Sequence, residues 1–402
     1  MKVIDRRGFL VRTGGGAVAF AFSPVLKGMT PLAASEEPLR TGVVGVGRQG
    51  RAILAELAKL PASQVVAIAD PDERRVKAGL RRAEGAQAFS SVKEMISGTE
   101  GLQAVVVATP THLHRAPAET ALAAGLHVYC EAPMCSTLED AEALASASAA
   151  GKGIFAVGLE ARTNPIYNLA RSFVRAGALR ETIGLRGQWH RKTSWRFGTT
   201  EAHNWRLDPA VSMGLPGEEG SHQFDVFAWY LKKKPLRVRG AGSVRFYQDG
   251  RTVPDTVQLE MEYEGGLQLL WDASLASSFE GRHELFRGSH ASVKMAEGFG
   301  WMFKEADAPT QGWEVYASRQ RFHNDEGITL IADATKLAKQ GKLKEGIGLP
   351  HPSVHYALES FLSAAQSGKP PAAGASEGLS AVAAGVAANQ ALATDGWVEV
   401  AG

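Results

Sequence analysis

Hydrophobic and polar positions follow two different patterns along the chain. Between residues 42 and 158, short and nearly continuous apolar runs alternate with stretches in which apolar residues recur every three or four positions. The first pattern is typical of parallel strands buried on both faces, and the second is typical of amphipathic helices. Their alternation predicts a doubly wound α/β sheet. The predicted strands are 42–46, 64–69, 104–108, 127–130 and 153–158.

Beyond residue 160 the apolar positions alternate with polar ones over longer runs, which indicates strands with one covered face. Strands are predicted at 184–189, 236–246, 257–263, 267–273 and 291–295, with helices at 165–176, 223–231, 354–367 and 376–393. We expect a substrate and oligomerisation domain of α+β type at 161–350, built on one large open, mostly antiparallel sheet. The helices of residues 351–402 are expected to pack back on the first domain. The segment 301–327 shows no clear period and is open to three interpretations: a substrate lid, a dimer contact or a long surface loop.

The first predicted strand runs into a glycine-rich turn with the spacing Gly45-x-Gly47-x-x-Gly50. In a dinucleotide site the first glycine makes the tight turn, the second lets the backbone approach a pyrophosphate, and the third lets helix and strand pack closely. The helix that follows offers free N–H groups to the phosphates. Asp70 ends the second strand about twenty residues later, where a carboxylate binds the ribose hydroxyls. We therefore predict an N-terminal Rossmann domain for NAD at 38–160.

The first residues have the pattern of an export signal. The pair Arg6-Arg7 precedes a small apolar run at 14–22, and small residues near Ala34 offer a cleavage site. This pattern predicts a twin-arginine signal peptide at 1–34 and a periplasmic or secreted protein that is exported folded. Because free nicotinamide cofactor is scarce outside the cell, we expect a tightly held cofactor that leaves with the protein. The alternative is a disordered tail with chance arginines.

Composition sets limits on the remaining function classes. The chain has 402 residues, a formal net charge of +2 and 45% hydrophobic residues, which fits two globular domains. No basic block indicates nucleic-acid binding, and no apolar run is long enough to span a membrane. An oxidising compartment would permit a disulfide between Cys130 and Cys135, but we interpret both as small packing residues near the cofactor pocket. No paired histidines lie near them in the sequence, so we predict no metal site.

Six sequence blocks resemble the Gfo/Idh/MocA oxidoreductases, over nearly the whole chain after the signal. The blocks are Gly45-x-Gly47-x-x-Gly50, Asp70, Thr109-Pro110-Thr111-x-x-His114, Glu131-Ala132-Pro133, Trp205-Arg206-Leu207-Asp208-Pro209 and Glu218-x-Gly220-x-His222-x-x-Asp225. The resemblance implies a nicotinamide nucleotide, sugar-type substrates and frequent dimers or tetramers. The residues expected at the cofactor are Gly45, Gly47, Arg48, Gln49, Gly50, Asp70, Thr109, Pro110, His114, Glu131, Ala132, Arg162, Trp205 and Arg206. Asp70 favours NAD because a carboxylate repels a 2′-phosphate, whereas Arg48 and Arg74 keep NADP as the lesser alternative.

The chain departs from the family pattern at two positions that bear on the chemistry. The family has Glu-Lys-Pro in the fourth block, and its lysine helps to move a proton, but this chain has Ala132 there. Glu218 replaces an aspartate in the last block, with Glu219 beside it. His222 is retained and becomes the candidate acid or base, since an imidazole exchanges protons near neutral pH. We therefore predict His222 and Glu218 as the catalytic residues.

Three functions remain open at this level. The first is an NAD-dependent oxidoreductase acting on a carbohydrate or polyol. The second is a redox-neutral glycoside hydrolase or lyase, which would oxidise the sugar transiently, eliminate the leaving group, add water and reduce the ketone again. The third is a non-catalytic sugar-binding protein. We expect a homodimer or homotetramer formed through the open sheet. Residues that could select the sugar are Arg162, Trp189, His190, Arg191, Lys192, Trp195, His203 and His323.

Overall fold

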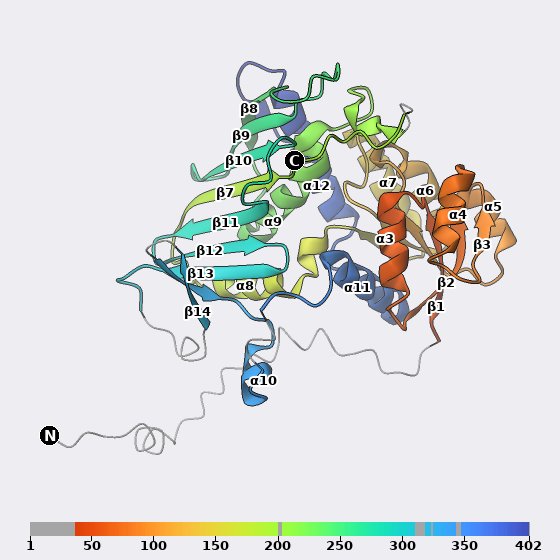
Figure 1. The fold of residues 1–402 in the computed structure, drawn as a ribbon, viewed down its shortest axis with the longest axis horizontal. Helices are drawn as coiled ribbons and strands as arrows, with labels where there is room; N and C mark the ends of the chain where they lie inside the picture. Colours follow the sequence, from red (N-terminus) through yellow and green to blue (C-terminus); the bar gives the residue numbers. More distant parts are fainter. Residues whose placement is uncertain (1–36, 200–202, 310–317, 323–324, 343–346, 402) are drawn as a thin grey trace. The chain divides into compact units, whose positions relative to one another are not determined.

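The computed structural model describes residues 37–199, 203–309, 318–322, 325–342 and 347–401, and two sheets organise them (Figure 1). The predicted signal peptide lies outside the described residues. The first sheet has six strands in the order β3-β2-β1-β4-β5-β6. They are β1 (Leu39–Val44), β2 (Ser63–Ala69), β3 (Gln87–Phe89), β4 (Ala104–Val107), β5 (His127–Cys130) and β6 (Phe155–Val157). The helices between them are α3 (Arg48–Leu57), α4 (Glu73–Leu80), α5 (Val92–Gly98), α6 (Arg115–Ala123) and α7 (Leu138–Ala150).

The strand order reverses between β1 and β4. All neighbouring strands of this sheet are parallel, and β1 pairs with β2 on one side and with β4 on the other. The connections from β1 and from β4 therefore leave on opposite faces, which opens the sheet at the carboxyl ends of these two strands. This switch point is where a doubly wound sheet binds its ligand.

Polar side chains fix where several helices begin. Asp72 accepts hydrogen bonds from two backbone N–H groups at the start of α4, and Ser91 and Thr137 each accept one at the starts of α5 and α7. Each bond satisfies a backbone donor that has no partner within the helix. The helices predicted at 165–176, 223–231, 354–367 and 376–393 also lie within a few residues of the observed ones.

The second sheet has ten strands in the order β14-β15-β13-β12-β11-β7-β10-β9-β8-β16. Its neighbours are antiparallel apart from the β7–β10 pair, among the strands that the structure describes. The strands are β7 (Thr182–His190), β8 (Arg237–Ser243), β9 (Thr256–Glu262), β10 (Gln268–Ser274), β11 (Arg282–Gly288), β12 (Ala291–Ala296), β13 (Phe299–Lys304), β14 (Ser318–Phe322), β15 (Asp325–Thr329) and β16 (Val398–Glu399). The predicted fold class is confirmed: a parallel Rossmann sheet is followed by a large, mostly antiparallel sheet.

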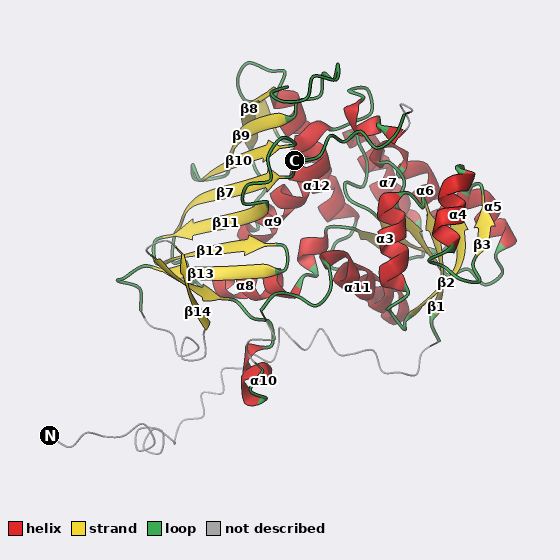
Figure 2. Cartoon of the chain, viewed as in Figure 1, coloured by secondary structure: helices red, strands yellow, loops and turns green. Residues whose placement is uncertain are grey.

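Helices cover one face of the second sheet (Figure 2). They are α8 (Pro165–Arg175), α9 (Ser221–Leu231) and α12 (Ala375–Ala391), and their apolar side chains share one core with the strands. Phe224 of α9 packs edge-on against Trp271 of β10 with ring centroids 5.3 Å apart. The short helix α10 (Ala334–Lys339) follows β15. Within the described residues no helix combines the length and apolarity needed to cross a membrane.

The two C-terminal helices contact the first domain. Leu358 and Phe361 of α11 (Ser353–Ser367) lie in the same core as Ile53 and Leu54 of α3. Alanine and glycine make up much of α12, which lets it come close to its neighbours: a Cβ at Gly385 would lie 3.0 Å from the Cα of Gly217. This helix contributes to the cores on both sides of it.

Several sheet segments were not predicted as strands, including the short strands β3 and β16. Part of the segment 301–327 forms β13, β14 and the start of β15 at one edge of the second sheet, and residues 310–317 and 323–324 lie outside the described residues. Strand β11 was missed because it contains the charged or polar residues Arg282, His283 and Glu284, which break the apolar alternation. These side chains are accommodated because their partners come from neighbouring helices and strands.

Candidate active site

The glycine turn between β1 and α3 leaves space for a phosphate. Gly45 has a φ of 84°, and a Cβ on it would lie 2.7 Å from the carbonyl oxygen of Ala108. A Cβ on Gly50 would lie 1.9 Å from the carbonyl oxygen of Gly45. A Cβ on Gly47, by contrast, would meet no atom within 4 Å. The first and third glycines are therefore required by packing within the protein, and the second faces open space at the start of α3, where a pyrophosphate would approach.

Asp70 stands directly after β2 and is nearly fully buried. Its Oδ2 accepts a hydrogen bond from the N–H of Val46 at 2.9 Å, and its Oδ1 accepts one from the N–H of Asp72 at 2.9 Å. Each carboxylate oxygen keeps a second lone pair, so a ribose hydroxyl can still donate to it. Asp70 thus ties the glycine turn to β2 and presents a negative charge to the ribose, which fits NAD.

The loop after β4 contains a buried polar atom without a partner. The Thr109 hydroxyl is buried and makes no hydrogen bond to any described residue. This fits a bound ligand that supplies the missing hydrogen bond. Pro110 precedes the short helix Thr111–Leu113. His114 was predicted to line the cofactor, but its two ring nitrogens lie 2.9 Å from the Pro133 carbonyl and 2.8 Å from the Thr109 carbonyl. The His114 ring therefore connects two loops of the protein instead of facing a ligand.

A second contact joins the glycine turn to the loop after β5. The Gln49 Nε2 donates to the Glu131 Oε1 at 3.2 Å. Burial raises the pKa of Glu131, and hydrogen bonds from Gln49 and from the backbone of Ala132 oppose that rise. Burial and the nearby Glu131 carboxylate also raise the pKa of Glu160. Both carboxyl groups therefore stay protonated to a higher pH than an exposed glutamate, and Glu131 directly precedes Ala132, where the family lysine is missing.

Trp205 and Arg206 reach the loop after β4 from the second domain. The Trp205 ring lies 5.6 Å from that of His112, and the Arg206 guanidinium lies 4.2 Å from the Trp205 ring centre. The Arg206 Nε is 3.6 Å from the Glu218 Oε2. Both residues therefore lie at the switch point, as the sequence blocks predict.

Positive charge gathers in front of the glycine turn. The pKa of Arg48 is lowered by partial burial and by the neighbouring guanidinium groups of Arg191 and Arg206, with the Glu219 carboxylate opposing them. Arg48 also lies 4.9 Å from the ring centre of Phe197. A cluster of guanidinium groups near the N-terminus of α3 fits an anion such as a pyrophosphate.

The two neighbouring glutamates of the last block have different environments. They lie in the π-helix Pro216–Gly220, which continues directly into α9. Glu218 is buried and accepts hydrogen bonds from the Thr111 hydroxyl at 3.0 Å and from the Met213 N–H at 3.4 Å. Its oxygens are thus used to join the two domains, so the structure does not support Glu218 as a catalytic group. Glu219 is only half-buried, and burial raises its pKa to about 7.

His222 lies three residues beyond Glu219 in the continuous helix. Burial, with the positive charges of Arg282 and Arg206, lowers the pKa of His222 to about 3. A hydrogen bond to the backbone of Ala132 opposes this shift, as expected when the ring N–H donates to a carbonyl oxygen. The imidazole is therefore neutral at neutral pH, and its other nitrogen has a free lone pair. The unprotonated nitrogen can accept a proton, but a pKa this low makes His222 a weak base that must pass the proton on.

A buried network that the sequence did not reveal holds α9 against the second sheet. The Gln223 Nε2 donates to the Glu284 Oε1 at 2.8 Å, and the Gln223 Oε1 accepts from the Trp271 Nε1 at 2.8 Å. Tyr167 of α8 donates to the other oxygen of Glu284, and the Arg282 Nε lies 3.3 Å from Glu284. This network fixes the position of α9 and hence of His222.

Comparison with known proteins assigns the family. Residues 39–159 match the profile described as "Oxidoreductase family, NAD-binding Rossmann fold", and residues 167–294 match the one described as "GFO/IDH/MocA C-terminal domain". Together these two regions make up more than half of the chain. The protein belongs to the Gfo/Idh/MocA oxidoreductase family. Its first domain is an NAD-binding Rossmann domain, as predicted.

Similar proteins in the family include sugar and polyol dehydrogenases. An inositol 2-dehydrogenase of Corynebacterium glutamicum is 31% identical over 202 residues, which are 50% of this chain and 56% of that protein. A levoglucosan dehydrogenase of Pseudarthrobacter phenanthrenivorans is 25% identical over 249 residues, 56% of this chain and 63% of that protein. The chain thus spans little more than half the length of the curated relatives that it matches.

Solved structures of the family share the fold over most of the chain. A levoglucosan dehydrogenase in complex with NADH and levoglucosan has a TM-score of 0.74 at 20% identity, covering 90% of this chain and 99% of that one. An aldose-aldose oxidoreductase from Caulobacter crescentus has a TM-score of 0.71 at 18% identity, with the same coverage of both chains. At these identities the likeness concerns the fold.

Arg162 was predicted to lie at the cofactor, but the structure gives it a different role. Its guanidinium makes two hydrogen bonds to the carboxylate of Asp225, at 2.9 and 2.8 Å, and both side chains are largely buried. A guanidinium engaged in this way has little left for a cofactor. The pair joins the end of the first domain to α9, so Arg162 is a structural residue.

Removing one partner of this pair should destabilise the protein strongly. Asp225→Ala leaves the Arg162 charge buried without a counter-ion, which typically costs about 3–5 kcal/mol in the free energy of unfolding. Urea denaturation monitored by far-UV circular dichroism measures this loss. The double variant Arg162→Met with Asp225→Leu should recover most of the stability, because no charge remains buried. Equal losses in the single and double variants would contradict this account.

The remaining sequence candidates are dispersed. Trp189 and Trp195 are buried in the core of the second domain, and His190 lies 2.6 Å from the Asp272 carboxylate. Lys192 lies 5.2 Å from the ring centre of Phe246. His323 is outside the described residues. Cys130 and Cys135 are buried and not bonded to each other. Of the specificity candidates, Arg191 stands nearest to the charged groups of the switch point, beside Arg48 and Glu219.

Proposed function

We propose that the protein is an NAD-dependent oxidoreductase that oxidises a hydroxyl group of a carbohydrate or polyol. The observation that carries this proposal is the position of His222, whose ring hydrogen-bonds to the backbone of Ala132 at the end of the Rossmann sheet. The Thr111–Glu218 and Gln49–Glu131 contacts link α9, the loops after β4 and β5, and the glycine turn into one site. The sugar and polyol dehydrogenases among the relatives support the substrate class.

Residues of the first domain would hold the cofactor. The glycine turn and the start of α3 fit the pyrophosphate, Asp70 fits the adenosine ribose, and the unpartnered Thr109 hydroxyl fits a donor or acceptor of the ligand. When bound, NAD accepts a hydride from the carbon that carries the reacting hydroxyl. The protein supplies orientation and proton transfer.

His222 would accept the proton of the reacting hydroxyl. Its free nitrogen is a base at any pH above about 3, the value to which burial and the two arginines lower its pKa. Protonated His222 would be unstable beside Arg282 and Arg206, so the proton must pass on. We propose that it passes to Glu219, three residues earlier in the same continuous helix, whose carboxylate can receive it. Ala132 has no group that can take part.

The pH dependence of the reaction should therefore follow Glu219. Its carboxyl group is protonated below its pKa of about 7 and ionised above it, so the single-turnover rate should rise as the pH increases through 7. A pH–rate profile of wild type measures this rising limb of the curve. In Glu219→Gln the limb should disappear and the rate should be low at all pH values. A limb near pH 6.5 that persists in Glu219→Gln would instead indicate that His222 titrates normally.

We further propose that NAD stays bound during export and turnover. The paired arginines and the scarcity of nicotinamide cofactors outside the cell support a retained cofactor in a periplasmic or secreted protein. The test is to purify the exported protein without added cofactor, denature it and quantify the released nucleotide. Nearly stoichiometric NAD is expected, and protein free of nucleotide would contradict the proposal.

A redox-neutral glycoside cleavage is a second candidate, favoured by Ala132. This reaction needs two groups that exchange protons at neighbouring positions of the sugar, and His222 with Glu219 provides them without the lysine. Incubation with nitrophenyl glycosides in the absence of added cofactor distinguishes the two candidates. Release of nitrophenol without net NADH supports cleavage, whereas net NADH from an unsubstituted sugar supports a dehydrogenase.

The open face of the second sheet supports self-association. Its strands alternate buried and exposed positions, and Ile183 and Leu270 expose 66% and 51% of their surface on that face. We propose that this face forms the contact of a homodimer or homotetramer. Light scattering of wild type and of Ile183→Lys with Leu270→Lys tests it; an unchanged oligomer in the variant, or a monomeric wild type, would contradict it.

A further inference from the structure

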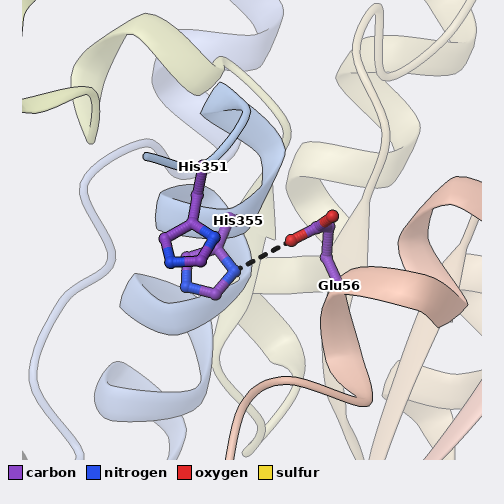
Figure 3. A group of neighbouring side chains, drawn as sticks. All are labelled: Glu56, His351 and His355. Carbon is purple, nitrogen blue, oxygen red and sulfur yellow. Dashed lines mark hydrogen bonds and ion pairs between the residues drawn. The ribbon is translucent and has the colours of Figure 1, made fainter. Parts of the chain in front are cut away.

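Glu56, His351 and His355 form a cluster away from the switch point (Figure 3). Glu56 lies in the last turn of α3, His355 lies in the first turn of α11, and His351 immediately precedes that helix. One ligand atom from each residue lies within 4.8 Å of the other two. Because 299 residues separate Glu56 from His355, no local sequence pattern indicates this grouping.

The side chains are arranged with their donor atoms together. The His351 and His355 rings are stacked, with centroids 4.0 Å apart and planes inclined by 14°. The Glu56 Oε2 lies 3.0 Å from the His355 Nδ1, and Figure 3 shows the carboxylate pointing toward the imidazole pair. Glu56 and His355 are each 7% exposed, whereas His351 is more accessible. Two imidazoles and one carboxylate thus share a largely buried position.

The carboxylate of Glu56 is ready to act as a ligand. Its Oε2 lies 3.0 Å from the His355 Nδ1, so this oxygen is already beside one of the other ligand atoms. Lys59 is its second partner, with the Nζ 2.6 Å from the Glu56 Oε1 and half of the lysine side chain in solvent. Lys59 can therefore move into solvent when another cation binds Glu56.

We propose that Glu56, His351 and His355 bind a zinc ion. Two histidines and a glutamate are a recognised ligand set for Zn²⁺ with one position left for water. In a tetrahedral site, ligand atoms lie about 3.3 Å apart at metal distances of about 2.0–2.1 Å. The widest separation here must shrink by about 1.5 Å to reach that geometry. Rotation of His351, which stands before the helix and is partly accessible, provides this movement.

A neighbouring cavity gives the ion access. His351 lines a cavity of about 420 Å³, together with Pro350, Ser353, Arg282 and Glu297. Water in this cavity can occupy the fourth position of the metal. The ion would link the end of α3 to the start of α11, and α3 carries the glycine turn at its other end. Bound zinc should therefore stabilise the packing of α11 on the nucleotide domain and raise the unfolding temperature of the protein.

Zinc titration of the full chain tests the proposal. The protein is purified without a histidine tag, stripped with a chelator and titrated with Zn²⁺ in a calorimeter. We expect one ion per chain. His351→Ala and Glu56→Gln should each weaken zinc binding by at least about 100-fold, which is more than the loss of a residue that only hydrogen-bonds to a metal ligand. His351→Ala keeps the Glu56–His355 hydrogen bond, and its unfolding temperature in chelator should equal that of wild type, which confirms that it folds.

Two further variants make the result decisive. Lys59→Met removes the cation that competes for Glu56 and should tighten zinc binding. His190→Gln alters another histidine–carboxylate pair, with Asp272, and should leave zinc binding unchanged. Absence of binding in wild type, or binding that survives both ligand substitutions, would overturn the proposal. In that case the cluster acts only as a hydrogen-bonded tether between α3 and α11, and Lys59→Met would lower stability without any effect of zinc.

Discussion

His222→Asn is expected to lower the single-turnover rate of hydroxyl oxidation by about 10²–10⁴-fold, the usual contribution of a positioned general base. Asparagine can keep a hydrogen bond to the Ala132 backbone, but its side chain has no basic nitrogen. The amount of bound NAD should not change, because His222 is not among the residues proposed to hold NAD. Stopped-flow measurement of reduced nicotinamide and nucleotide release on denaturation give the two quantities.

The control for this variant is His290→Gln. His290 lies 2.9 Å from Arg180 in an exposed pair, so its loss should affect neither rate nor nucleotide content. If His222→Asn lost its nucleotide, His222 would belong to the cofactor site. If it turned over at the wild-type rate, another group would be the base, and Glu219 would be the first to examine.

Gly50→Ala is expected to abolish NAD binding and to destabilise the protein. The added Cβ would lie 1.9 Å from the carbonyl oxygen of Gly45, so either α3 or the turn must move. Overpacking of this kind typically costs about 1–3 kcal/mol in the free energy of unfolding, and backbone against backbone has little room to relax. The displaced turn would no longer present its N–H groups to a pyrophosphate. Urea denaturation and nucleotide content measure both effects.

Gly47→Ala separates ligand binding from stability. A Cβ at this position meets no protein atom within 4 Å, so the unfolding free energy without NAD should stay close to that of wild type. The same methyl group would occupy space proposed for the pyrophosphate, and NAD content should fall. Full NAD content in Gly47→Ala, or unchanged stability in Gly50→Ala, would contradict the assigned roles of the two glycines.

The sequence predicted what depends on local pattern. The apolar strands and the glycine turn specify the Rossmann sheet because buried parallel strands and tight turns impose strong requirements on individual residues. The same local pattern placed Asp70 at the end of the second strand, whereas Thr109 and Trp205 were assigned through the resemblance to the family. Strand β11 escaped detection because the buried Glu284 within it is stabilised by Tyr167 and Gln223. Such partners are distant in the chain, and no local period indicates them.

Roles of individual charged residues were harder to predict than their location. Glu218 and Glu219 are neighbours in the sequence, yet only the contacts with Thr111 and Met213 show that Glu218 is buried in a structural role. Arg162 was assigned to the cofactor, but its partner Asp225 lies 63 residues away. The identity of a partner decides whether a charge is structural or functional, and partners are set by the tertiary fold.

The most direct test of the proposed function is a single-turnover experiment without added cofactor. The purified protein, with the NAD it retains, is mixed with unsubstituted sugars and polyols such as inositol and levoglucosan, and the absorbance of reduced nicotinamide is followed. For at least one substrate, the account predicts reduced nicotinamide up to one equivalent per bound NAD in wild type, and almost none in His222→Asn over the same time. Fully NAD-loaded wild type that reduces no nicotinamide with any of these substrates, or equal rates in the two proteins, would contradict it.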